Sequence, residues 1–317
     1  MSLSLLKYAE HLDGRDDPRP LGPEPKPFPS VKPHLTLQPV KAVIYSGLGT
    51  LWFASEEPRL LATDETMRKI ALDKTVTEFK MWASMSRKPG DPSDYLCAML
   101  QTIADKLIAA NLLTGRTEIR IEQVWQGILD RLFQKEYAYD AGFFGSPGEY
   151  SEKIALYYQR ASQGMSMPAK ALAALKTVGK KGVLQGVHAN GQQATPVLLH
   201  RELVMQGKLS SLAEVFEPAL CIWSFETGVK KEADKGNALQ VGLASKGLKP
   251  SDVLCVGSDV ERDIVPAKRR GFRTALLLVD TATAKVKPTD LKDEKTKPNV
   301  LLTSFEQIAS VVPQVGA

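Results

Sequence analysis

The chain has 317 residues, 43% of them hydrophobic and 24% charged, the proportions of an ordinary globular protein, and a mild formal charge of +5. No run approaches the roughly 20 apolar residues that span a bilayer, and the first residues lack the pattern of a signal peptide, so we expect no membrane association. Basic pieces such as residues 268–273 lie beside expected helix ends, where cations complement the helix dipole, so nucleic-acid binding is not expected either.

Cysteine usage favours a reducing compartment. The three cysteines, Cys97, Cys221 and Cys255, cannot all pair with one another. Cys221 and Cys255 lie in apolar, strand-like runs, where buried thiols serve as packing residues. We therefore expect a cytoplasmic protein.

The first 39 residues form a separate N-terminal unit. Residues 2–12 predict a short amphipathic helix. Residues 13–39 contain eight prolines, which forbid a helix and deny a strand its donors, so polyproline II or extended chain is expected. This arm is expected to lie over the surface of the domain or over a partner.

From Val40 onward, short apolar runs of strand length alternate with helix-like stretches. The expected strands are residues 40–45, 182–187, 219–223, 253–257, 274–279 and 299–303. Helices are expected near residues 167–179, 234–250 and 263–271, with glycine or proline at their ends. This alternation predicts an α/β domain with a parallel sheet flanked by helices on both faces.

Residues 55–164 interrupt this alternation. They carry Leu, Met, Ala and aromatic residues at helical spacing, as in residues 95–113 and 121–137, and no strand pattern. We expect an inserted helical domain, between two pieces of the α/β core at residues 40–54 and 165–317. Its aromatic and Met side chains are expected in the core of a helical bundle, with a ligand-facing surface as the alternative.

The order of strand, small-residue turn, helical insert and further alternating units resembles the haloacid dehalogenase (HAD) superfamily with a helical cap. The resemblance covers roughly residues 40–312 and is most specific over residues 212–279. It implies a Rossmann-like core with a parallel sheet and an α-helical cap domain. In active HAD phosphohydrolases the first strand ends in Asp-x-Asp-Gly-Thr-Leu. The first Asp is the nucleophile and a Mg²⁺ ligand, and the second is the general acid and base.

The first motif keeps its tail, Gly49-Thr50-Leu51, but lacks both acids. Ser46 stands at the position of the nucleophile and Leu48 at that of the acid/base. Leucine cannot transfer a proton, and serine needs an adjacent base, which this loop does not offer.

The second motif has also changed. Ala189 replaces the family's Ser or Thr, and the family-like Asn190 and Gly191 follow. His188 lies beside them without an identifiable acidic partner, so it is either a packing residue or a catalytic one.

The third motif is the best preserved, because Ser224, Gly228 and Lys231 match Ser-x-x-x-Gly-x-x-Lys. The lysine would neutralise phosphoryl charge, although Lys230 makes its identity ambiguous and a solvent-facing lysine is the alternative.

In the fourth motif Gly257 and Asp263 fit, but Ser258 replaces the first acid and Asp259 comes one position late. Mg²⁺ needs near-octahedral oxygen ligands, so these two acids alone make a weak metal site. Asp263 is instead expected to bond backbone groups or to pair with Lys231.

These replacements predict a HAD-fold protein without hydrolase activity, acting as a protein-binding or anion-binding module, where the anion is a phosphate-containing small molecule. The expected protein contacts are with an unknown partner or with a second copy of the chain, and the proline-rich arm is one place where they could form. No cofactor is expected, and Mg²⁺ only if residual activity exists. The alternative is a phosphatase-type hydrolase with altered catalytic residues, using Ser46 or His188 with Lys231. The motif-equivalent catalytic positions are Ser46, Leu48, Ala189 and Lys231; the ligand-binding candidates are Ser46, Gly47, Thr50, Asn190, Gly191 and Lys231; the weak metal candidates are Asp259 and Asp263.

Nucleotide-binding loops are excluded. Residues 46–52 contain Gly-x-Gly but lack the third glycine of the dinucleotide fingerprint, and no acidic residue ends a following strand. The Gly-Lys-Ser/Thr of a P-loop is missing as well.

Overall fold

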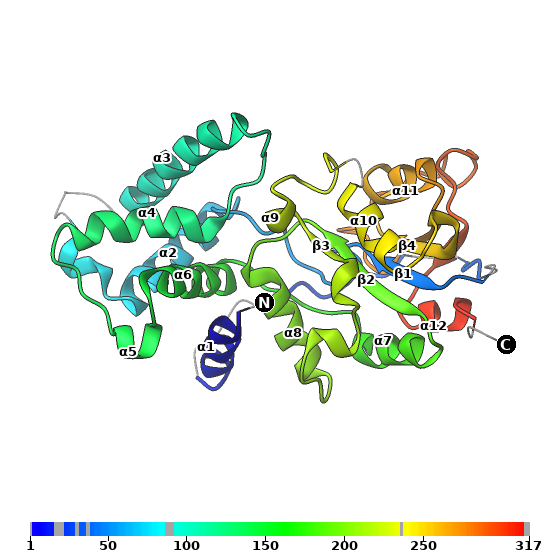
Figure 1. Cartoon of the computed structure of the whole chain (residues 1–317), viewed down its shortest axis with the longest axis horizontal. Coiled ribbons are helices and arrows are strands. Elements are labelled where there is room, and N and C mark those ends of the chain that lie inside the picture. Colours follow the sequence, from blue (N-terminus) through cyan, green and yellow to red (C-terminus); the bar gives the residue numbers. More distant parts are fainter. Residues whose placement is uncertain are drawn as a thin grey trace.

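The computed structural model describes residues 2–15, 22–28, 32–35, 39–85, 92–234 and 237–313. Its strands lie at one end and most helices of the segment between β1 and β2 at the other, with α1 and α8 between them (Figure 1).

A single parallel sheet forms the centre of the α/β part. Its strands are β1 (Ala42–Tyr45), β2 (Leu184–Ala189), β3 (Cys221–Trp223), β4 (Val253–Gly257), β5 (Arg273–Leu277) and β6 (Val300–Leu302). The 6-stranded sheet has the order β3-β2-β1-β4-β5-β6, and every pair is parallel. Each strand overlaps one of the predicted apolar runs, with β2 ending two residues later and β5 beginning one residue earlier than predicted, which confirms the predicted fold class.

Helices cover both faces of this sheet, so β1 is buried on each side. Val43 and Tyr45 belong to an apolar cluster shared with α7, α8 and α12, whereas Ala42 and Ile44 belong to another, shared with α10 and α11. These helices are α7 (Ala171–Lys180), α8 (Ala194–Met205), α10 (Asn237–Ser245), α11 (Val265–Arg269) and α12 (Gln307–Val311). A strand buried on both faces accounts for the continuous apolar run of β1.

Between β1 and α7, the described residues form helices and no strand of the sheet. The α-helices of this segment are α2 (Glu65–Glu78), α3 (Pro92–Leu112), α4 (Ile121–Phe133), α5 (Ala141–Phe144) and α6 (Pro147–Ser162). Their buried aromatic residues, including Trp125, Tyr150 and Tyr158, lie in one apolar cluster, as the core interpretation expected. We call α2–α6 the helical insert; the predicted domain boundaries at residues 55 and 164 stay a prediction.

The predicted N-terminal helix is α1 (Leu3–Asp13), and it packs onto the insert rather than standing apart as an arm. Leu5, Tyr8 and Leu12 belong to the same apolar cluster as α2–α6, together with residues of α8. Arg201 of α8 donates its Nε to Asp13 over 2.7 Å. The helix therefore joins the insert and the α/β part.

The described pieces of the proline-rich arm lie on the surface of the protein itself. Of the two expected positions, over the domain or over a partner, this is the first. The Lys26 amide donates to Asp280 over 3.0 Å, and His34 exchanges two backbone hydrogen bonds with Leu301 of β6. The second contact covers the backbone of an edge strand. The rest of residues 13–39, at 16–21, 29–31 and 36–38, lies outside the described residues.

Among the helices that the structure describes, none has the length and apolarity to cross a membrane.

Candidate functional site

The loop after β1 folds tightly over two glycines. The carbonyl of Gly47 accepts the amides of Thr50 (3.0 Å) and Leu51 (2.9 Å), and Gly49 has a left-handed φ of 76°. A Cβ on Gly47 would lie 2.4 Å from the Trp52 ring, so this turn tolerates no larger residue. The loop thereby fixes Ser46 at the carboxyl end of β1, the edge at which ligands of parallel sheets bind.

Ser46 lies in contact with Lys231 and Asp263. Its hydroxyl accepts from the Lys231 Nζ over 2.7 Å and donates to the Asp263 carboxylate over 2.9 Å. Lys231 also forms an ion pair with Asp263. The structure thus brings Lys231, rather than Lys230, to the end of β1, and confirms the expected pairing of Asp263.

Asp263 is held as a carboxylate from several sides. Burial opposes its charge, but Lys231, backbone amides and Ser46 outweigh burial and lower its pKa. One carboxylate oxygen accepts from the amides of Ser258 (2.9 Å) and Asp259 (3.0 Å). All of its strong acceptor sites therefore have partners within the protein.

Asp259 is committed to a helix end. Its side chain accepts from the amides of Glu261 and Arg262, each over 2.9 Å, and caps η5 (Val260–Ile264). Burial and the neighbouring Asp263 raise its pKa. Among the described residues, no three His, Cys, Asp or Glu side chains are grouped to hold a metal ion. Asp259 and Asp263 each have their hydrogen-bond partners within the protein.

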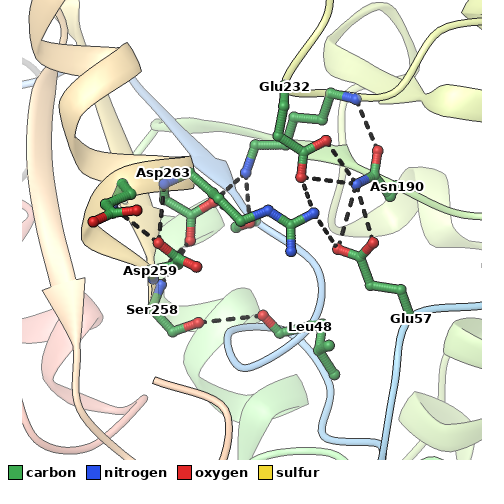
Figure 2. A network of polar contacts seen from close by, with 11 residues as sticks. Leu48, Glu57, Asn190, Glu232, Ser258, Asp259 and Asp263 are labelled. Carbon is green, nitrogen blue, oxygen red and sulfur yellow. Dashed lines mark hydrogen bonds and ion pairs between the residues drawn. The ribbon is translucent and has the colours of Figure 1, made fainter. Parts of the chain in front are cut away.

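A second polar network lies across the mouth of this site (Figure 2). The Asn190 amide group donates to Glu57 (3.3 Å) and to Glu232 (3.1 Å), and its oxygen accepts the Lys231 amide over 2.8 Å. Arg262 pairs with Glu57 over 3.1 Å and also with Glu232. Because Glu57 lies in the segment that leads from β1 into the insert and Arg262 belongs to the core, this network fixes that segment against the core. We call Glu57, Asn190, Glu232 and Arg262 the bridging network.

The cavity enclosed by these groups is small and more acidic than basic. Its volume is about 50 Å³, space for a few water molecules. Its ionisable lining residues are four acids and two bases, namely Glu57, Glu232, Asp259, Asp263, Lys231 and Arg262. An anion of metabolite size would have to separate these side chains and approach a net negative lining.

The ligand-binding candidates divide into two sets. Ser46, Gly47, Asn190 and Lys231 line the cavity. Thr50 and Gly191 do not: Thr50 is fully buried, and the Gly191 amide donates to the Ser224 hydroxyl over 3.0 Å.

The amides of the loop after β1 are also partly engaged. The amides of Gly49 and Thr50 donate to carbonyls of Trp52 and Gly47, so the anion-binding nest expected over residues 47–50 is in large part closed.

His188 has an acidic partner that the sequence did not reveal. Its Nε2 lies 3.5 Å from an Asp234 carboxylate oxygen, and both side chains are buried. Burial lowers the pKa of His188. Its neighbour Ala189 is buried at the end of β2 and offers no hydroxyl. None of the described hydrogen bonds joins His188 to Ser46, so the arrangement favours a packing role for this histidine.

Three members of the bridging network, Glu57, Glu232 and Arg262, were not predicted from the sequence. Glu232 and Arg262 lie next to motif positions 231 and 263, and this proximity was the one available signal. Glu57 follows the first motif by several residues and carries no signal of its own.

An all-parallel sheet with a helical insert after its central strand, and charged groups at the carboxyl edge, defines an open-sheet α/β protein. Comparison with solved structures narrows this class to the HAD fold. The 2-haloacid dehalogenase from Pseudomonas syringae pv. Tomato DC3000 superposes with a TM-score of 0.53 at 17% identity, covering 86% of this chain and 97% of that one.

Two other solved structures are similar to the chain at lower scores. The L-2-haloacid dehalogenase from Xanthobacter autotrophicus with covalently bound chloropropionic acid is 15% identical, with a TM-score of 0.41 and coverage of 86% and 98%. A predicted phosphoglycolate phosphatase from Haemophilus somnus 129pt is 13% identical, with a TM-score of 0.43 and coverage of 86% and 97%. No protein-family model and no curated protein sequence matches the chain.

Proposed function

We propose that this protein is a HAD-fold protein that acts by binding and does not hydrolyse a ligand in the cleft at Ser46. The observation that carries the proposal is the contact among Ser46, Lys231 and Asp263. The amine that could stabilise a phosphoryl group is already neutralised by an internal carboxylate. At the other motif position of the same loop, Leu48 has no group that could transfer a proton.

Protein contact is better supported than binding of a phosphorylated metabolite. The cavity of about 50 Å³ is bridged by Glu57, Arg262 and Glu232, and four acids against two bases line this part of the cleft. By contrast, Ile108, Leu112 and Leu113 at the end of α3 are exposed large apolar side chains. Exposed apolar groups of this kind accompany protein–protein interaction sites.

The specific alternative is a hydrolase with a serine nucleophile. The distance of 2.7 Å between Lys231 Nζ and Ser46 Oγ favours it, because a neutral lysine at that distance could accept the serine proton. The ion pair with Asp263 opposes it, since the Lys231 amine is already engaged by that carboxylate.

The test measures turnover and binding on the full chain. The wild type, Ser46→Ala and Lys231→Met are each assayed for hydrolysis of 4-nitrophenyl phosphate with Mg²⁺ and of 2-chloropropionate. We expect no turnover above the buffer rate for any of them, and no thermal shift with inorganic phosphate. Turnover that disappears in Ser46→Ala would establish the hydrolase alternative instead.

Protein contact is measured in parallel by sedimentation equilibrium over a range of concentrations. We expect association of the wild type that Leu113→Glu weakens. The same substitution at the exposed Ala110 of α3 is the control. A monomer at every concentration would contradict self-association.

A further inference from the structure

A cavity much larger than the one at Ser46 lies away from the cleft, beside the edge strand β3. Its volume is about 490 Å³, against about 50 Å³ for the cleft at Ser46, and the two share no lining residue. It is enclosed by β3, residues 212–218, the start of α8 and the segment that joins α3 to α4. Small-molecule sites commonly measure about 300 to 1,000 Å³, so this cavity has the size of a ligand site.

The floor of this cavity is apolar and aromatic. Trp223 and Cys221 lie two residues apart on β3 and share a face with Val187 of β2, as the parallel register requires. Phe216 and Phe225 complete the floor. Such a surface suits a flat apolar body, because aromatic rings stack on one another at little entropic cost.

One cation at the rim is available to a ligand. Arg120 is engaged, since it donates to Gln193 over 2.9 Å and pairs with Glu122. The Arg116 side chain is exposed and makes no hydrogen bond or ion pair with the residues that the structure describes.

The position of Arg116 depends on a glycine. A Cβ on Gly228 would lie 2.2 Å from the Arg116 Nε, and Gly228 has a left-handed φ of 76° at the end of α9 (Ser224–Thr227). The Gly228 carbonyl also accepts the amides of Thr117 and Glu118, each over 2.9 Å. These contacts fix the Arg116 segment of the insert against the core at the cavity rim.

We propose that this cavity binds a small organic carboxylate with a planar apolar body, whose carboxylate pairs with Arg116 and whose rings lie on the apolar floor. A guanidinium binds a carboxylate through two parallel hydrogen bonds. Glu226 also lines the cavity, and its charge repels a phosphate dianion more strongly than a carboxylate monoanion. The site is independent of the function proposed for the cleft.

The experiment is calorimetric titration of the full chain with 2-naphthoate. 2-Naphthalenemethanol serves as the neutral analogue and 2-naphthyl phosphate as the dianionic one. We expect 2-naphthoate to bind more tightly than either analogue. Arg116→Gln should weaken 2-naphthoate about tenfold, the effect of losing a charged hydrogen-bond partner, and should leave the neutral analogue unchanged.

Two further variants distinguish binding in this cavity from binding elsewhere on the surface. Ala213 is exposed at the cavity edge, so Ala213→Phe should fill the space and abolish binding of 2-naphthoate without burying a polar group. Arg131→Gln, which removes the same charge from α4 outside the cavity, is the control and should have no effect.

Four results would overturn the proposal. They are the absence of heat at millimolar 2-naphthoate, equal affinity for the acid and the alcohol, tighter binding of the phosphate, and unchanged affinity in Ala213→Phe. Far-ultraviolet circular dichroism and melting temperature check that each variant is folded.

Discussion

At this site, Asp263 and Lys231 are partners of each other within the protein. The Lys231 amine contacts both the Asp263 carboxylate and the Ser46 hydroxyl, and both ionised side chains are largely buried. Removing one partner of a buried ion pair leaves the other charge uncompensated, which costs more than the pair contributes. The pair is therefore best tested by removing one partner and then both.

Asp263→Asn should lower the free energy of unfolding by about 3 to 5 kcal/mol, because the largely buried Lys231 amine then lacks its carboxylate partner. The double variant Asp263→Asn, Lys231→Met should recover most of that loss. Urea unfolding at pH 7 measures both. Equal stability of the single variant and the wild type would contradict the pairing.

The same carboxylate predicts a pH dependence. Its pKa is lower in the folded protein than in the unfolded chain, so its contribution is complete above the ordinary carboxyl pKa and is lost as the pH falls through the lowered value. The wild type should therefore lose stability more steeply than Asp263→Asn as the pH falls below about 4.

At the scale of elements, the turn after β1 is built around the space that Gly47 leaves empty. Trp52 packs over that position, and Trp52 in turn stacks on Trp223 of β3 with ring centroids 6.3 Å apart. Because Trp52 is buried, its ring has no free volume into which it can move. The turn is therefore held by packing as well as by its hydrogen bonds.

Gly47→Ala should destabilise the protein by about 1 to 3 kcal/mol, because the added methyl lies 2.4 Å from the Trp52 ring and 2.9 Å from the Ala189 Cβ. Gly148→Ala in α6 is the matched control. No atom lies within 4 Å of its added methyl, and it should stabilise by about 0.4 to 1 kcal/mol. Thermal unfolding of the two variants gives the comparison, and equal effects would show that Gly47 is not constrained by packing.

At the scale of the whole molecule, α1 connects parts of the chain that are distant in sequence. Its buried face packs against α6 of the insert and α8 of the core, and Asp13 pairs with Arg160 and Arg201 on those two helices. Glu57 and Arg262 make a second connection at the cleft. Together with the hydrogen bonds of Thr117 and Glu118 to the Gly228 carbonyl, these contacts fix the insert to the core at several places.

Leu12→Ala should lower stability by about 2 to 5 kcal/mol, since this side chain is fully buried between α1 and its neighbours. Leu3→Ala, the same substitution at an exposed position of the same helix, should change it by less than about 0.5 kcal/mol. Chemical unfolding of both variants provides the measurement. Similar small effects would show that α1 does not stabilise the fold.

Much of the fold could be predicted because its signals are local. The six strands are short apolar runs, and α7, α10 and α11 end at glycine or proline punctuation. The position of α1 could not be predicted, because an amphipathic helix shows which face it buries but not against what.

Part of the candidate site could also be predicted from the sequence, because some of its residues lie in local motifs. Ser46, Lys231 and Asp263 each lie in a recognisable motif, whereas the bridging network and Asp234 do not. The pairing of His188 with Asp234 joins two residues of different elements, and no spacing along the chain reveals such a contact.

The sequence by itself determined the order of strands and helices, the resemblance to the HAD superfamily, and the presence of Ser46 and Leu48 where that family carries acids. These features are encoded in periodicity and in neighbouring residues. Only the tertiary structure decided which charges neutralise one another. Lys231 and Asp263 are 32 residues apart and Lys231 and Ser46 are 185 apart, and only the folded chain brings the three side chains into contact. The cavity beside β3 likewise exists only where the insert, α8 and an edge strand meet, because a concave surface between distant segments has no local code.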